Sequence, residues 1–83
     1  MVRILYFAAL ADALGQTSEE LALPASVTTV VGLLECLRGR GDVWRDVLAT
    51  NAVRVTVNRG FATAETAIAD GDEVALVPKR DGA

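Results

Sequence analysis

Few residues of this chain have the types and spacing that catalysis requires. The 83 residues include one cysteine, Cys36, and no histidine. A Cys/His zinc site and a Ser/His or Cys/His nucleophile pair therefore cannot be built. This excludes most familiar hydrolases and leaves three features to weigh: the cysteine, a group of acids and the C-terminal segment.

The cysteine and the acids both have ordinary structural explanations. Cys36 could carry a persulfide, but no histidine is present to activate it, and a lone helical cysteine usually serves as a small packing residue. Asp70, Asp72 and Glu73 could suggest a metal site, yet no further ligand pattern accompanies them. We expect these acids to form a turn and the solvated start of a strand.

The last stretch, DGDEVALVPKRDGA (residues 70–83), runs from a turn through an apolar strand into a short polar tail. We expect a flexible tail over residues 78–83 within a single domain over residues 1–83. A chain terminus of this kind is usually only disordered. The alternative is that Gly82 and Ala83 are presented to another protein.

Two kinds of periodicity predict the elements that must position this tail. Strands are expected at residues 2–7, within TSEELALP (17–24), at VRVTVN (53–58), near Phe61 and at EVALVP (73–78). A short helix is expected over residues 8–14, and a helical turn in DVWRDVLA (42–49) should lay Trp44 and Leu48 over one end of the core. The main helix lies in SVTTVVGLLECLRGRG (26–41), where a threonine caps a run of apolar residues at helical spacing.

These elements predict an α+β fold in which one main helix covers a mixed sheet of about five strands, which is the β-grasp, or ubiquitin-like, roll. The chain is 52% hydrophobic and 23% charged, too apolar for a disordered protein. The net charge of −3 is spread out, so nucleic acid is not an expected partner. The sequence lacks a membrane span and a signal peptide, which predicts a cytoplasmic location.

The segments ILYFAALADALG, VTVN and DGDEVALVP, followed by a short tail after Pro78, resemble the small subunit of molybdopterin synthase. This family consists of ubiquitin-like sulfur carriers, and the resemblance covers essentially the whole chain. It implies a non-catalytic subunit that binds no cofactor or metal. An ATP-using, E1-like activating enzyme adenylates its C-terminus, which is then converted to a thiocarboxylate. The large synthase subunit, in a heterotetramer, uses that sulfur to build the dithiolene of molybdopterin.

The resemblance assigns the sulfur-accepting terminus to Gly82 and Ala83, where the family has Gly-Gly. A glycine tail can thread a narrow channel because it lacks a Cβ atom. Natural variation, an engineered substitution and a chosen chain boundary are all compatible with an alanine at position 83.

The expected partner interface combines the sheet and the tail. Phe7, Phe61 and Val77 should lie on the sheet face opposite the main helix, at positions that contact partners in the family. Pro78, Lys79 and Arg80 extend this interface, although the two cations could instead only keep the tail soluble. Two alternative functions remain: a sulfur carrier for thiamine or tRNA thiolation, and a ubiquitin-like interaction module without carrier activity.

Overall fold

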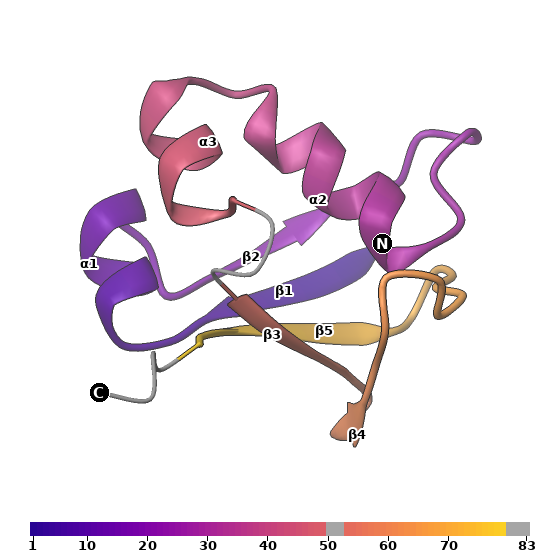
Figure 1. The fold of residues 1–83 in the computed structure, drawn as a ribbon. Helices are drawn as coiled ribbons and strands as arrows, with labels where there is room; N and C mark the ends of the chain where they lie inside the picture. The colour runs from indigo at the N-terminus through magenta and orange to yellow at the C-terminus, as the bar shows by residue number, and fades with distance from the viewer. Residues whose placement is uncertain (50–52, 80–83) are drawn as a thin grey trace.

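The computed structural model describes residues 1–49 and 53–79, which form a five-stranded mixed sheet with α2 and α3 over one face (Figure 1). The strands are β1 (Val2–Tyr6), β2 (Ser18–Leu21), β3 (Val53–Val57), β4 (Gly60–Phe61) and β5 (Glu73–Pro78), and the helices are α1 (Ala9–Leu14), α2 (Val30–Arg38) and α3 (Asp42–Val47). The strand order is β2-β1-β5-β3-β4, in which only β1 and β5 are parallel neighbours. The predicted β-grasp architecture is confirmed.

The core forms between the sheet and α2 because each contributes one apolar face. In β1, Val2 and Ile4 are fully buried, whereas Arg3 between them is exposed, which is the alternation of a half-buried strand. Leu33 and Leu37 of α2 are also fully buried. Each such leucine contributes about 1.5–3 kcal/mol to folding. The core thus fixes which face of each strand remains open.

Side-chain hydrogen bonds hold both ends of helix α2. The sequence left Thr28 and Thr29 as candidates for the N-cap, and the Thr29 side chain accepts a hydrogen bond from the Gly32 N–H at 3.3 Å, so Thr29 is the cap. Near the other end, Arg38 donates from Nη1 to the Leu48 carbonyl at 2.7 Å. Leu48 is fully buried and Trp44 packs against the core, so the predicted placement of both residues is confirmed.

A polar network joins the antiparallel strands β1 and β2 to Arg40 and to α3. The Tyr6 hydroxyl donates to Glu19 Oε1 at 2.5 Å, and Arg40 donates to both Glu19 oxygens at 2.7 and 3.1 Å. The Arg40 guanidinium also lies 4.7 Å from the ring centroid of Trp44. Burial and the contact with Glu19 raise the pKa of Tyr6. The network connects three segments that lie far apart in the sequence: β1, β2 and the stretch that contains Arg40 and Trp44.

Two tight turns set the register of the second half of the sheet. Asn58 and Arg59 both have positive φ angles, 52° and 71°, as the two central residues of a type I′ hairpin turn require. At the other turn, Gly71 has a φ of 93°, and the Asp72 carboxylate accepts from the Asn58 side chain and the Ala69 N–H. These hydrogen bonds lower the pKa of Asp72. The expected role of the acids as turn residues is confirmed.

Among the described residues, the longest helix is α2 with nine residues, and no helix has the length and apolar character that crossing a membrane demands.

Candidate partner interface

The sheet face away from α2 is open, and the strand register defines which side chains lie on it. One row crosses all five strands: Ser18 pairs with Leu5, Leu5 with Ala75, Ala75 with Thr56, and Thr56 with Phe61. On β1, β3 and β5 the residues of this row alternate with buried ones, so their side chains point away from the core. The open face therefore has an uncharged central row.

The next row brings together two of the predicted interface residues. Val77 pairs with Arg54, and the Phe7 N–H donates to the carbonyl of Leu76, which places Phe7 on the strand next to Val77. Phe7 is 44% exposed and Val77 is 36% exposed. We call these two residues the Phe7–Val77 patch. The patch lies at the end of β5 from which the chain continues toward its C-terminus.

Phe61 lies on the same open face but not next to this patch. It is 92% exposed and sits on β4 at the sheet edge, with β3 between it and β5. Arg54 and Thr56 of β3 therefore separate Phe61 from Val77. The structure brings Phe7 and Val77 together and leaves Phe61 as a separate apolar side chain.

The opposite end of the open face is charged. Arg3 pairs with Glu20 on one side and with Glu73 on the other, and its guanidinium lies 3.6 Å from the Glu20 carboxylate. Both side chains of this ion pair are 58% exposed, so it contributes little to stability. A partner that buries apolar surface would meet the face at the Phe7–Val77 end.

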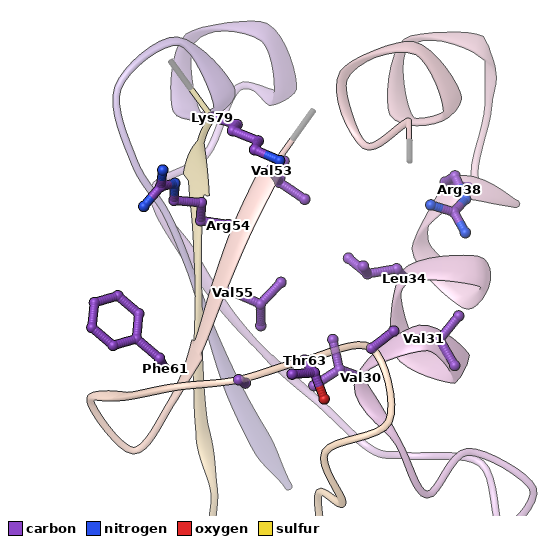
Figure 2. A pocket seen from close by; sticks show the side chains of 12 residues that line it. Val30, Val31, Leu34, Arg38, Val53, Arg54, Val55, Phe61, Thr63 and Lys79 are labelled. Carbon is purple, nitrogen blue, oxygen red and sulfur yellow. The ribbon is translucent and has the colours of Figure 1, made fainter. Parts of the chain in front are cut away.

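The residues that follow the patch are placed in different ways. Pro78, expected to begin the tail, is the last residue of β5 and pairs with Val53. Lys79 is exposed, and its side chain points toward Val53 on the helix side of the sheet (Figure 2). Arg80, Gly82 and Ala83 lie outside the described residues.

Sequence reasoning missed Leu5 and Arg54 on this surface and misjudged Cys36. Leu5 lies two residues before Phe7 on the same face, so the alternation of β1 was a signal that could have identified it. Cys36 is exposed, so the packing role that a lone helical cysteine usually has does not apply to it. The apolar face of α2 is formed by the buried residues Val30, Leu33 and Leu37, and Cys36 lies off that face.

Comparison with known proteins supplies the family context of this surface. The ThiS family model matches residues 4–82. A molybdopterin synthase sulfur carrier subunit from Pyrenophora tritici-repentis is 43% identical over 79 residues, which cover 90% of this chain and 82% of that protein.

Two solved structures have the same fold. The HVO 2177 protein of Haloferax volcanii superposes with a TM-score of 0.83 at 24% identity, covering 99% of this chain and 85% of that chain. A chain in the complex of subunits 1 and 2 of the molybdopterin-converting factor from Helicobacter pylori gives a TM-score of 0.65 at 14% identity, covering 99% of this chain and 97% of the other. At these identities the likeness establishes the fold alone.

Proposed function

The chain belongs to the ThiS family, and from this premise we propose that it acts as the sulfur carrier subunit of a molybdopterin synthase. The observation that carries the proposal is the 43% identity to a relative that bears this name, in a match that covers 90% of this chain and 82% of the relative. The geometry agrees with a carrier role, because the Phe7–Val77 patch lies beside the end of β5 that leads to the C-terminus.

The proposed chemistry takes place on the carboxylate of Ala83. A carboxylate is a poor electrophile, so an E1-like partner first transfers AMP from ATP to it and releases pyrophosphate. A sulfur donor then attacks the acyl-adenylate and displaces AMP, which leaves a thiocarboxylate on the carrier. The large subunit of the synthase takes this sulfur for the dithiolene of molybdopterin. The carrier supplies no catalytic side chain and binds no cofactor in this scheme; ATP is used by its partner.

The alanine at position 83 is expected to slow this chemistry. One methyl group in a channel that fits glycine costs about 1–3 kcal/mol, by analogy with overpacking of a protein core. At about 1.36 kcal/mol per decade, this corresponds to a rate lower by about 5- to 160-fold. The Ala83→Gly variant should recover that factor.

Intact-mass spectrometry tests the carrier chemistry. The full chain and its Ala83→Gly variant are incubated with a molybdopterin-type activating enzyme, ATP and a sulfur donor. A mass gain equal to the difference between sulfur and oxygen in both proteins, faster in the variant, is expected. Conversion of neither protein would refute the carrier proposal and would favour an interaction module, a function with which the Gly82-Ala83 ending is also compatible.

The recipient of the sulfur separates the remaining alternative. The thiocarboxylated chain is mixed with a large synthase subunit and its pterin precursor, and dithiolene formation is measured. A carrier for thiamine or tRNA thiolation would be loaded by its activating enzyme but would give no dithiolene in this assay.

We extend the proposal to the Phe7–Val77 patch as the surface that contacts the large subunit. Phe7→Asp should weaken binding to that subunit at least about tenfold, because truncating a central apolar anchor commonly costs more than about 1.4 kcal/mol. Val43→Asp is the matched control, since Val43 is 51% exposed on α3, away from the open face. Equal effects of the two substitutions would contradict this assignment.

A further inference from the structure

A groove separates α2 from the outer edge of β3, on the helix side of the sheet (Figure 2). Its volume is about 470 Å³, and the segment after β4, residues 62–64, closes it at one end. We call it the α2–β3 groove. It is separate from the Phe7–Val77 patch, which lies on the opposite face of the sheet.

The walls of the α2–β3 groove are apolar. Val31 and Leu34 of α2 face it from one side, and Val53 and Val55 of β3 face it from the other. Val31 is 38% exposed, while Leu34 and Val53 are only partly buried. Apolar side chains therefore remain accessible here, although each element has already contributed its buried residues to the core.

Among the described residues, the backbone at the edge of the groove is only partly paired. Strand β4 pairs with β3 only at Thr56 and Val57. The Ala62 N–H donates a hydrogen bond to the Val55 carbonyl at 3.1 Å. The alternation of an antiparallel pair turns the N–H and C=O of Val53 away from β5, toward the groove. Within residues 1–49 and 53–79, neither group of Val53 makes a hydrogen bond outside the strand. Such an edge can accept another strand.

Positive charge marks the Val53 end of the groove. Arg38 and Lys79 both lie there, and no aspartate or glutamate is among the described residues that line the groove. Lys79 forms no ion pair within the described part of the chain, and Arg38 uses Nη1 for the Leu48 carbonyl, which leaves its Nη2 donors for a ligand. On a chain of net charge −3, this local positive charge favours an anionic occupant.

We propose that the α2–β3 groove binds an extended acidic segment of a partner protein. The segment pairs with the backbone of Val53 as a short added strand and seats one apolar side chain between Leu34 and Val55. A carboxylate of the segment lies between Arg38 and Lys79. Strand addition supplies affinity through the main chain, while the apolar pocket and the charges select the sequence. The site lies on the opposite face of the sheet from the Phe7–Val77 patch, and the proposal goes beyond the sulfur carrier function.

Nuclear magnetic resonance on the full ¹⁵N-labelled chain tests this proposal with a synthetic probe. The probe is the acetylated peptide Thr-Val-Thr-Leu-Thr-Asp-Asp, which alternates apolar side chains and ends in two acids. We expect the amide signals of Val31, Leu34 and Val53 to shift on titration, while those of Phe7 and Val77 stay in place. A control peptide that ends in Lys-Lys should bind more weakly.

A matched pair of charge reversals tests the role of Lys79. Lys79→Glu should raise the Kd of the acidic peptide about 3- to 10-fold, because an exposed attraction becomes a repulsion. Arg54→Glu makes the same change of charge on the residue after Val53. Arg54 also lines the groove, but its side chain extends to the side of β3 away from Leu34 and Arg38 (Figure 2), so less than a twofold change is expected.

Four results would overturn the proposal. One is equal binding of the acidic and basic peptides, and another is an equal effect of the two charge reversals. The third is a set of shifts centred on Phe7 and Val77, which would assign the peptide to the open face. Absence of any shift at millimolar peptide would also refute it.

Discussion

Replacing Glu19 with glutamine should destabilise the fold although it keeps the shape of the side chain. The Glu19 carboxylate accepts three hydrogen bonds, one from Tyr6 and two from Arg40. In the Glu19→Gln variant one oxygen becomes an NH₂ group, which then faces Arg40 Nη2, a donor that lies 3.1 Å from Glu19 Oε2. One charge-assisted hydrogen bond is lost and two donors oppose each other.

The expected cost follows from the exposure of the pair. A hydrogen bond to a charged group is worth about 1.5–3 kcal/mol when buried. The side chains of Arg40 and Glu19 are 30% and 18% exposed, so solvent screening lowers this to about 1–2 kcal/mol. Glu20→Gln is the matched control, because the Arg3–Glu20 pair is 58% exposed on both sides and should contribute less than about 0.5 kcal/mol.

The pH dependence gives an independent check on the same network. Burial alone would raise the pKa of Glu19, but the hydrogen bonds from Arg40 and Tyr6 outweigh burial and hold this pKa below its ordinary value of 4.5. The stabilisation is therefore complete above pH 4.5 and is lost as the pH falls through the lowered pKa of the folded state. The difference between wild type and Glu19→Gln should shrink over that range.

Urea unfolding followed by the fluorescence of Trp44, the single tryptophan, measures the free energy of unfolding at pH 7 and at lower pH. The reasoning fails if Glu19→Gln costs no more than Glu20→Gln at pH 7, or if its cost is the same at every pH.

Three further perturbations test other parts of the fold. Tyr6 is the only tyrosine, and since burial and Glu19 raise its pKa above the ordinary 10.0, stability should be full below pH 10 and fall as the pH rises above it; ultraviolet absorbance should detect ionisation only together with unfolding, and Tyr6→Phe should abolish that dependence. Leu33→Ala should cost about 2–5 kcal/mol by leaving a cavity, against less than about 1 kcal/mol for Val31→Ala on the exposed side of the same helix, both measured by urea unfolding. Ala8 has a φ of 53° and a ψ of −129°, so Ala8→Gly should raise the free energy of unfolding by about 1 kcal/mol; a lower urea midpoint would contradict the inferred backbone strain.

The elements of this fold were predictable because local rules and tertiary packing agree. The alternation in VRVTV corresponds to a strand with Val55 buried, and the Thr29 cap with its apolar run corresponds to α2. In each case the pattern that favours the element is the pattern that the core uses.

The polar network could not be predicted, since its members are distant in the sequence. Glu19 lies 13 residues from Tyr6 and 21 from Arg40, and only the pairing of β1 with β2 and the return of the chain after α2 bring them together. Similarly, the sequence predicted that Phe61 lies on the open face of the sheet, but it did not predict that Phe61 is separated from Val77. That separation results from the two-residue length of β4 and its position at the sheet edge.

The central position of β5 has a mechanical consequence. β5 lies between β1 and β3, parallel to the first and antiparallel to the second, and it is the strand from which the chain leaves after Pro78. A force applied to the chain beyond Pro78, along the strand axis, would load both ladders of hydrogen bonds in shear. The hydrogen bonds of both ladders would share the tension. When an edge strand is peeled from a sheet, by contrast, its hydrogen bonds break one after another. An enzyme that grips and withdraws the C-terminal segment would therefore pull on the most strongly anchored strand of the protein.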